Sequence, residues 1–315
     1  MKPVVLMVPQ LPAAFVAELA QDYELIGPLE RSSREALPQG AARAEALLTI
    51  GGLPTDAALI DALPQLRLIA CYGTGYEGVD RAHAARRGIA LTNAGDANAD
   101  SVAEFALGLM LAATRDIALG DRFVRNGRWA GNAVERLPIA PGLSGRRLGI
   151  FGLGAIGQRV ATRAAVFGMA IGYHNRSRKA ELDYAYFETL PELAQWADVL
   201  LVAVRASDQT RHAIDAPILA ALGKHGYLVN ISRGSTVDED ALCDALDAGQ
   251  LAGAALDVYQ NEPDVAQRIR RQERIVLTPH IGANAALAQA EQMRVMKHNL
   301  AAVFAGQPLR NRVDA

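Results

Sequence analysis

Short apolar runs alternate with segments of helical periodicity in the first part of the chain. The apolar runs, each expected to form a strand, are residues 4–8, 46–50, 66–70 and 89–91. Segments with the spacing of amphipathic helices separate them at residues 12–20, 56–62 and 79–87. Alternation of buried strands with helices is typical of a parallel sheet that has helices on both faces. The pattern therefore predicts an α/β domain at the N-terminus.

A second alternating series begins with an apolar run, residues 148–151, that leads into a glycine-rich turn. Further strands are expected at residues 169–174, 199–203, 227–231, 254–257 and 275–277, with helices such as residues 238–248 between them. Six strands of this kind match a complete dinucleotide-binding sheet. A long final helix, residues 283–305, is expected to return the chain to the first domain. We therefore predict one domain from residues 1–97 and 284–315 and another from residues 98–283.

The two series are joined by a loop of small and polar residues, 93–99, and an unusually apolar helix. Ser101 and Glu104 have the spacing of a capping box, which predicts that this helix begins there. It is apolar nearly all round up to residue 115, and helices of that kind are buried. We expect it to lie between domains or at a subunit interface, followed by a second helix over residues 116–126.

The glycine-rich turn carries the first chemical signal. Gly152, Gly154 and Gly157 are spaced G-x-G-x-x-G, after a predicted strand and before a predicted helix. In that context the glycines let the backbone approach a pyrophosphate, and the helix N-terminus directs N–H groups at it. The residues expected to bind the dinucleotide here are Gly152, Leu153, Gly154, Ala155 and Ile156. The alternative is a glycine turn that only packs the strand against the helix.

Composition narrows the class of partner. The chain has 315 residues, half of them hydrophobic, and a net charge of −2, which gives no electrostatic reason to expect nucleic acid or an anionic membrane. No apolar stretch is long enough to cross a bilayer, and the N-terminus has no signal-peptide pattern. Cys71 and Cys243 stand far apart without metal-ligand spacing. We expect reduced cysteines, no metal and a cytoplasmic location.

The turn after the second strand of this series predicts which nucleotide binds. An acidic residue about 20 positions beyond the glycines would bind the ribose hydroxyls of NAD. The chain instead has Asn175, Arg176, Ser177 and Arg178 there. A 2′-phosphate would meet no carboxylate, and two guanidinium groups and a hydroxyl are available to bind it. We therefore predict NADP(H) in preference to NAD(H), with a solvated basic turn as the alternative.

Ionisable residues follow three late strands of the same series. Arg233, Glu262 and His280 each come soon after a predicted strand, so all three are expected at the carboxyl edge of the sheet. Singly, each has an ordinary explanation as a surface or loop residue. Together, at the edge where the nicotinamide end of a dinucleotide would reach, they indicate a hydride-transfer site.

A glycine loop in the first domain is a candidate for binding an anion. Residues 72–76, Tyr-Gly-Thr-Gly-Tyr, follow the predicted strand 66–70. Ligands of open α/β sheets bind beyond the carboxyl ends of strands, and glycines leave backbone N–H groups accessible. An ordinary glycine turn is the alternative from the residues alone.

Four motifs occur in the order and spacing of one known family. They are GLGAIG at residues 152–157, NISRG at 230–234, LDVYQNEP at 256–263 and PHIG at 279–282. With the 72–76 loop and the final helix, the chain resembles the D-isomer-specific 2-hydroxyacid dehydrogenases over nearly its whole length. The resemblance is nearest to the NADPH-dependent glyoxylate/hydroxypyruvate reductases. It implies a Rossmann-type doubly wound parallel sheet that binds the cofactor, a smaller flavodoxin-like substrate domain, and a homodimer.

The resemblance also implies roles for individual residues. Arg233, Glu262 and His280 are the expected catalytic residues. Val204, Ile231 and Asp257 are added to the expected cofactor site. The residues expected to bind substrate are Leu53, Gly73, Thr74 and Gly75 together with Arg233 and His280.

The expected reaction explains why these residue types are needed. Reduction of a 2-keto acid delivers a hydride to the carbonyl carbon and a proton to its oxygen. A histidine titrates near neutrality and can supply that proton, and Glu262 would favour the imidazolium of His280. Arg233 offers a planar fork to the substrate carboxylate and keto oxygen, and the N–H groups of Thr74 and Gly75 would bind the other side of the carboxylate.

Several alternatives stay open at this stage. Glyoxylate and hydroxypyruvate are the preferred substrates, but larger aryl keto acids are also considered because Leu53 and Tyr76 would suit an apolar pocket. A cofactor-sensing scaffold without enzymatic activity is a second class. The family usually has Ser-Ala-Thr after PHIG, where this chain has Ala-Asn-Ala, and Arg205 stands where a proline is common. The roles of Arg205 and Asn284 are not assigned.

Overall fold

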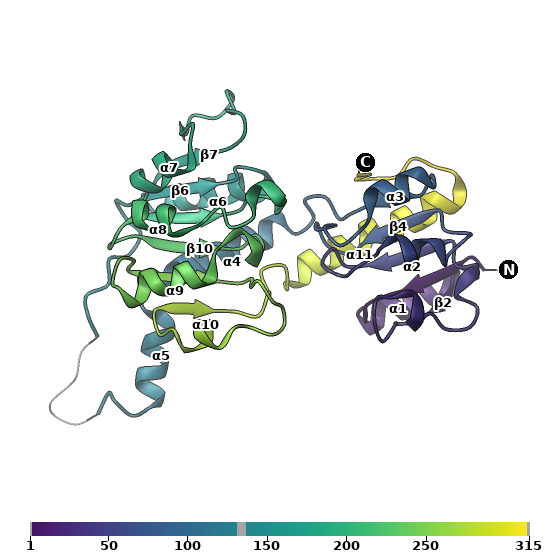
Figure 1. The fold of residues 1–315 in the computed structure, drawn as a ribbon, viewed down its shortest axis with the longest axis horizontal. Helices are drawn as coiled ribbons and strands as arrows, with labels where there is room; N and C mark the ends of the chain where they lie inside the picture. Colours follow the sequence, from purple (N-terminus) through teal and green to yellow (C-terminus); the bar gives the residue numbers. More distant parts are fainter. Residues whose placement is uncertain (1, 131–136, 314–315) are drawn as a thin grey trace. The chain divides into compact units, whose positions relative to one another are not determined.

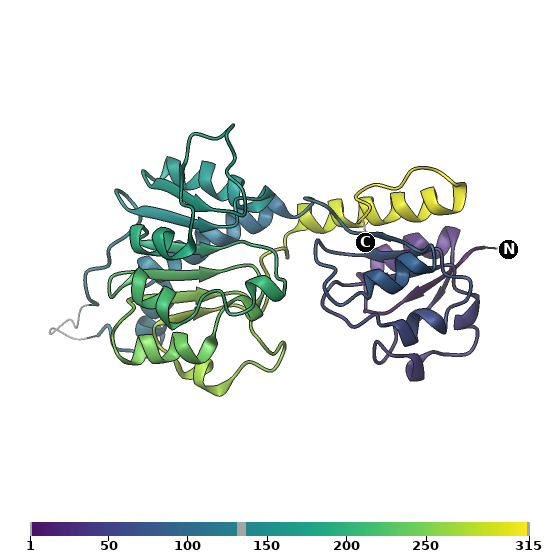
Figure 2. The same cartoon turned by 45° about the horizontal axis from the view of Figure 1, so that its top comes forward.

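The computed structural model describes residues 2–130 and 137–313, which form two compact units. Unit 1 consists of Met1–Asn98 and Ala285–Ala315, and unit 2 of Ala99–Asn284. Each unit contains one parallel sheet with helices on both faces (Figure 1; Figure 2). The predicted α/β class with two parallel sheets is therefore confirmed.

Unit 1 is built on a five-stranded sheet in the order β2-β1-β3-β4-β5. This is the flavodoxin-like order, in which ligands bind beyond the carboxyl ends of the strands. The strands are β1 (Val4–Met7), β2 (Glu24–Ile26), β3 (Ala46–Thr49), β4 (Leu68–Cys71) and β5 (Ala90–Thr92), and the helices are α1 (Ala13–Asp22), α2 (Ala57–Asp61), α3 (Arg81–Arg86) and α11 (Ala286–Ala305). Two short 3₁₀ helices, η1 (Arg34–Ala36) and η2 (Ala41–Arg43), lie in the connection between β2 and β3.

Alternate residues of the unit 1 strands face two separate cores. Leu6, Leu47 and Ile69 pack in one cluster with residues of α2 and α3. Their neighbours along the strands, including Met7 and Leu48, pack in the other cluster with α1 and α11. The period of two along each strand therefore attaches the C-terminal helix α11 to the same sheet as the N-terminal strands.

Unit 2 is built on a seven-stranded sheet in the order β12-β11-β10-β9-β6-β7-β8. The strands are β6 (Arg147–Phe151), β7 (Ala170–His174), β8 (Ala185–Tyr186), β9 (Val199–Val202), β10 (Tyr227–Asn230), β11 (Gly253–Leu256) and β12 (Ile275–Leu277). The helices are α4 (Ala99–Thr114), α5 (Ile117–Arg125), α6 (Ala155–Val166), α7 (Leu190–Trp196), α8 (Ala216–Leu222), α9 (Glu239–Asp247) and α10 (Gln267–Arg271), with 3₁₀ helices η3 (Asp208–Thr210) and η4 (Gly234–Thr236). The order is that of a doubly wound dinucleotide-binding sheet, and it is confirmed with one strand more than expected.

Each sheet has one strand that the sequence did not predict, β2 in unit 1 and β8 in unit 2, and both were missed for the same reason. β2 has three residues and β8 has two, and the residues of both are exposed or only partly buried. Neither therefore leaves an apolar run in the sequence, so periodicity alone did not reveal them.

The order of the strands fixes where a ligand belongs in unit 2. β6 is flanked by β7 on one side and β9 on the other, so the chain reverses its direction of winding between these strands. The loops that leave the carboxyl ends of β6 and β9 diverge at such a switch point and leave a crevice for a ligand. The glycine-rich turn is the loop that leaves β6.

The apolar helix α4 packs along one side against the core of unit 2, and its residues Glu104 and Gly108 are exposed. Val102, Ala106 and Met110 belong to the core formed with α6 and one face of the sheet. The helix begins at Ala99, so the predicted start at Ser101 is wrong. Contacts with α6 and with β10–β12 explain the apolar residues on its buried side, and the expected domain or subunit interface stays a prediction.

No helix in the described parts of the chain combines the length and the apolar composition that crossing a bilayer requires.

Candidate active site

The glycine-rich turn has the shape of a phosphate cradle. Gly152 has φ 102°, and a Cβ there would lie 2.5 Å from the backbone nitrogen of Val204. A Cβ on Gly157 would lie 2.4 Å from the carbonyl oxygen of Gly152, whereas one on Gly154 would meet no atom within 4 Å. The first and third glycines are thus required by packing, and the second faces open space on the ligand side.

The helix that follows adds donors to the cradle. α6 starts directly after Gly154, and no side chain caps its N-terminus. The first backbone N–H groups of a helix have no partners within it, and the helix dipole favours an anion there. Open space at Gly154 next to uncapped N–H groups fits a dinucleotide pyrophosphate.

The turn after β7 is attached to the same glycine loop. The Asn175 side-chain oxygen accepts a hydrogen bond of 2.8 Å from the backbone N–H of Leu153. Because the oxygen of Asn175 is used in this contact, its side-chain NH₂ remains as a hydrogen-bond donor. The exposed residues Arg176, Ser177 and Arg178 follow directly in the chain. The structure therefore brings the residues predicted to select the nucleotide to the residues predicted to bind its pyrophosphate.

Arg233 lies in the turn after β10, and hydrogen bonds from a buried side chain stabilise this turn. The Asn230 side chain is fully buried, accepts from the Ser232 N–H at 3.0 Å and donates to the Arg233 carbonyl at 3.1 Å. The Ser232 hydroxyl donates to the carbonyl of Val204, which connects this turn to the loop after β9. Ile231, just before the turn, lies in the core between the sheet and α4.

The Arg233 turn and the Glu262 loop are in direct contact. A Cβ on Gly234 would lie 1.8 Å from the carbonyl carbon of Tyr259, so only glycine allows this approach. In the same loop, the Tyr259 N–H donates to Glu262 Oε1 at 2.9 Å. The two motifs are therefore positioned against each other by backbone packing.

His280 and Glu262 form the predicted pair. His280 Nδ1 and Glu262 Oε2 are 2.7 Å apart, and the two side chains are 45% and 34% exposed. Burial alone would raise the pKa of Glu262, but the hydrogen bonds from His280 and from the Tyr259 N–H, with the charges of His280 and Arg233, outweigh it and lower that pKa. Glu262 is therefore held as a carboxylate beside the imidazole.

Asp257 holds the turn that carries His280. Its carboxylate is 2% exposed and accepts from the Thr278 hydroxyl at 2.6 Å, the Ile281 N–H at 2.9 Å and the Gly282 N–H at 2.8 Å. His280 itself has φ 53°, a conformation rare outside glycine. The three bonds around it explain how that conformation is maintained.

Two further residues of this network were not found by sequence reasoning. The Tyr259 hydroxyl donates to the carbonyls of Leu256 and Thr278, and burial raises the pKa of this phenol to about 12. Glu239 is buried and accepts the Gln260 N–H at 2.7 Å. The sequence signals that mark them are a polar residue in the loop after a buried strand, for Tyr259, and an acidic residue at the start of a helix, for Glu239.

In unit 1 the candidate substrate residues lie in two adjacent loops. Gly73, Thr74 and Gly75 follow β4, and Leu53 follows β3 and packs partly against the core that includes Tyr76. A Cβ on Gly51 would lie 2.1 Å from the carbonyl carbon of Gly75, so the two loops touch through their backbones. The N–H groups of Thr74 and Gly75 donate to no acceptor among the described residues.

The residues with unassigned roles lie next to the site. Arg205 follows Val204 in the loop after β9, and the Asn284 N–H donates to the carbonyl of Ile281 at 2.8 Å.

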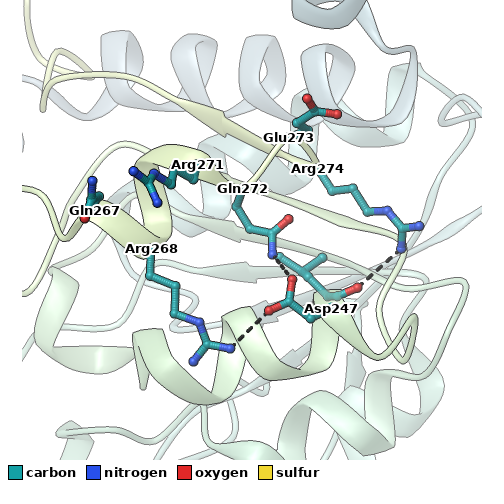
Figure 3. Close-up of a pocket in the computed structure, with 8 residues that line it drawn as sticks. Asp247, Gln267, Arg268, Arg271, Gln272, Glu273 and Arg274 are labelled. Atoms are coloured by element: carbon teal, nitrogen blue, oxygen red, sulfur yellow. Dashed lines mark hydrogen bonds and ion pairs between the residues drawn. The ribbon is translucent and has the colours of Figure 1, made fainter.

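A cavity of about 570 Å³ in unit 2 belongs to a different region (Figure 3). It lies at the end of α9 and just before β12, which is the opposite edge of the sheet from His280, after β12. Arg268 and Gln272 point toward Asp247 there and bind it at 3.1 Å and 2.6 Å. Arg268 is also paired with Asp244, so its charge is compensated and the cavity is not assigned to the active site.

Comparison with known proteins identifies the family. Residues 107–282 match the family model described as D-isomer specific 2-hydroxyacid dehydrogenase, NAD binding domain. The chain belongs to this family. The resemblance inferred from the four motifs is thereby confirmed, as is the prediction of a nicotinamide-dependent dehydrogenase or reductase. The whole of the matched segment lies within unit 2.

Curated relatives and solved structures cover almost the whole chain. Glyoxylate/hydroxypyruvate reductase HPR3 of Arabidopsis thaliana is 36% identical over 90% of this chain and 89% of that protein. Hydroxyphenylpyruvate reductase of Plectranthus scutellarioides is 38% identical over 88% of each. The structure of an NADPH-dependent glyoxylate/hydroxypyruvate reductase from Sinorhizobium meliloti, in complex with NADP and malonate, has a TM-score of 0.93 at 35% identity and covers 99% of this chain and 97% of that one.

Proposed function

We propose that the enzyme uses NADPH to reduce small 2-keto acids, such as glyoxylate and hydroxypyruvate, to D-2-hydroxy acids. The observation that carries this proposal is the His280–Glu262 pair, 2.7 Å apart, at the sheet edge that also carries Arg233. The names of the Arabidopsis and Sinorhizobium relatives support the same substrate class.

His280 is the proton donor in this proposal. Glu262 binds Nδ1, which leaves Nε2 on the other side of the ring to face the keto oxygen. Because Glu262 stays ionised, it accepts the hydrogen bond from the imidazole and orients the ring during the transfer. Asp257 acts on this step only indirectly, through the turn that carries His280.

The carboxylate of the substrate is bound by two kinds of donor. The guanidinium of Arg233 provides parallel N–H groups for a carboxylate oxygen and the keto oxygen. The N–H groups of Thr74 and Gly75 in unit 1 bind the carboxylate as well, and Leu53 contacts the rest of the substrate. We accordingly propose unit 1 as the substrate-binding domain and unit 2 as the dinucleotide-binding domain.

The residues of the glycine-rich turn fit a nicotinamide dinucleotide. Gly152, Leu153, Gly154, Ala155 and Ile156 would hold its pyrophosphate. Val204, Ile231 and Asp257, the other proposed cofactor residues, follow β9, β10 and β11. When bound, the cofactor supplies the hydride. The chain's own contribution is to hold the carbonyl carbon and the proton donor in register with it.

We propose NADPH over NADH from the turn after β7. Asn175 offers an uncharged amide where a carboxylate would repel a 2′-phosphate, and Arg176, Ser177 and Arg178 are exposed beside it. A hydrogen bond to a charged group contributes about 1.5–3 kcal/mol, which corresponds to about 10–100-fold in affinity. One such bond from an arginine is therefore enough to decide the preference.

Aryl keto acids are the second candidate substrates. The 38% identity to a hydroxyphenylpyruvate reductase favours them, and Leu53 and Tyr76 pack against the same core of unit 1. A larger substrate group would contact these apolar side chains.

A substrate and cofactor panel tests the proposal. Glyoxylate, hydroxypyruvate and phenylpyruvate are each offered with NADPH and with NADH, and oxidation of the cofactor is followed by absorbance. The proposal expects the highest kcat/KM for a small keto acid with NADPH. A higher value for phenylpyruvate would favour the aryl candidate, and equal or better use of NADH would reject the cofactor preference.

A variant of the cofactor turn sharpens that test. Arg176→Gln removes one guanidinium and leaves Asn175 in place, so KM for NADPH should rise by about 10-fold while KM for NADH stays unchanged. An equal change for both cofactors would show that the arginine does not bind the 2′-phosphate.

The homodimer and the cytoplasmic location expected from the sequence stay predictions.

A further inference from the structure

Asn93 hydrogen-bonds to the backbone of the candidate substrate loop, residues 73–75. It follows β5, is 8% exposed, and its side-chain NH₂ donates to the carbonyl of Thr74 at 2.7 Å. Its side-chain oxygen accepts the Gly95 N–H at 3.0 Å, which fixes the amide orientation. The next residue, Ala94, donates its N–H to the carbonyl of Gly73 at 2.9 Å. Two consecutive carbonyls of the loop are therefore bound by two consecutive residues.

Because the peptide bond is planar, these two contacts determine which way the N–H groups of Thr74 and Gly75 point. The Gly73–Thr74 and Thr74–Gly75 peptides are trans, so each C=O and the N–H of the same planar unit point in opposite directions. Binding the Gly73 carbonyl on one side therefore directs the Thr74 N–H to the other side. Binding the Thr74 carbonyl does the same for the Gly75 N–H.

The loop is also restrained next to these peptides. Gly51 lies so close to the carbonyl of Gly75 that a Cβ would approach its carbon to 2.1 Å. The N–H groups of Thr74 and Gly75 find no acceptor in the described parts of the chain, although the Gly75 residue is buried. Unused, adjacent and pre-oriented donors of this kind suit a carboxylate, which accepts at both oxygens.

We propose that Asn93 is a positioning residue for the substrate carboxylate. Its side-chain amide holds the Thr74–Gly75 peptide with the N–H outward, so that the keto acid meets donors that need no rearrangement. This inference rests on the proposed function, because it takes the anion to be the carboxylate of a 2-keto acid. Asn93 itself does not touch the substrate.

The test compares two buried asparagines. Asn93→Ala removes the donor to the Thr74 carbonyl. Asn299→Ala is the matched control, because Asn299 is also buried in unit 1 and binds the backbone N–H and carbonyl of Arg310, at 2.8 Å and 3.0 Å, instead of the glycine loop. Asn93→Gln keeps the amide and is the conservative variant.

Three measurements are made on each protein with saturating NADPH. They are KM and kcat for glyoxylate, the Kd for the unreactive carboxylate oxamate, and the NMR shifts of the Thr74 and Gly75 amides after selective ¹⁵N labelling. Oxamate should shift both amides in the unmodified enzyme. Asn93→Ala should raise KM and the oxamate Kd together by about 10-fold, the effect of weakening one hydrogen bond to a charged group. The NADPH Kd, measured separately by titrating NADPH without oxamate, should not change, and Asn93→Gln should recover part of the loss.

Each other outcome separates this inference from the proposed function. If the enzyme reduces glyoxylate but Asn93→Ala leaves KM unchanged, or Asn299→Ala raises it equally, the positioning role is overturned and the function stands. If Asn93→Ala does not fold, the amide shifts of the unmodified enzyme decide, and unshifted Thr74 and Gly75 amides overturn the inference. If the unmodified enzyme neither reduces keto acids nor binds oxamate, both proposals fail.

Discussion

Two regions of the molecule that we propose to bind substrate are built in different ways. The edge of unit 2 presents the side chains of the proposed catalytic residues, Arg233, Glu262 and His280. The loop after β4 in unit 1 presents backbone N–H groups of Thr74 and Gly75, and its side chains take no part in the proposed chemistry. The first region is defined by which residues it contains, and the second by how its backbone is held.

The supporting residues differ accordingly. In unit 2, buried polar side chains such as Asp257, Asn230 and Tyr259 each bind the backbone that carries a reactive side chain. In unit 1, the support comes from close backbone approach at Gly51 and from Asn93. A side-chain site should therefore lose most activity when its proposed catalytic atoms are removed. A backbone site should lose most when added atoms displace the loop.

Removal of the imidazole is expected to have the largest effect. His280→Ala deletes the proposed proton donor, and general acid–base catalysis contributes about 10²–10⁴-fold to a rate. We expect kcat to fall by that factor, while NADPH binding, measured by the fluorescence of the bound cofactor, is unchanged. Near-normal turnover would remove His280 from the mechanism.

Addition of one methyl group in unit 1 is expected to have the next largest effect. Gly51→Ala would place a Cβ 2.1 Å from the carbonyl carbon of Gly75 and must displace the loop. Because a displacement of about 1 Å can cost about 10²-fold, KM for the keto acid should rise steeply and kcat/KM should fall by up to that factor. Gly52→Ala is the control, since a Cβ there meets nothing within 4 Å. Equal losses in both variants would contradict a site made of positioned backbone.

The difference between a side-chain site and a backbone site also explains which residues the sequence could predict. Arg233, Glu262 and His280 were predicted because their residue types are the reagents of the reaction and each follows a strand. The structure places His280 and Glu262 in hydrogen-bond contact and packs the Arg233 turn against the Glu262 loop, as one sheet edge requires. Their catalytic roles stay predictions until the variants are measured.

The supporting residues were less accessible to sequence reasoning. Asn93 was only part of a polar loop, and its contact with the Thr74 carbonyl joins residues that two different strands bring together. The helix α4 was recognised as buried, but its burial partners, α6 and the sheet, depend on the order of strands. Residue type predicts reactivity and local periodicity predicts elements, whereas contacts between distant segments follow from topology.

A subtler removal tests the support of the side-chain site. Asp257→Asn keeps the shape but replaces one acceptor oxygen by an NH₂ group, so at least one of the three donors from Thr278, Ile281 and Gly282 loses its partner. A buried unsatisfied group costs about 1–3 kcal/mol, and we expect a loss of that size in the free energy of unfolding in urea. The kcat should fall by less than in His280→Ala, because the imidazole remains. Unchanged stability and kcat would contradict the positioning role of Asp257.

The smallest expected effect concerns Glu239, which supports the Glu262 loop by accepting the Gln260 N–H. Burial raises the pKa of Glu239; the Gln260 N–H opposes this, and the nearby Asp240 and Glu262 add to the rise. The folded protein therefore binds this proton more tightly than the unfolded chain, so stability is lost as pH rises from the ordinary glutamate range through the raised pKa. Glu239→Gln keeps an acceptor for Gln260 and carries no charge. Urea unfolding should show the variant gaining stability relative to the unmodified enzyme between acid and neutral pH. A difference that does not vary with pH would mean that Glu239 is not ionised against burial, and that its support of the loop is a hydrogen bond alone.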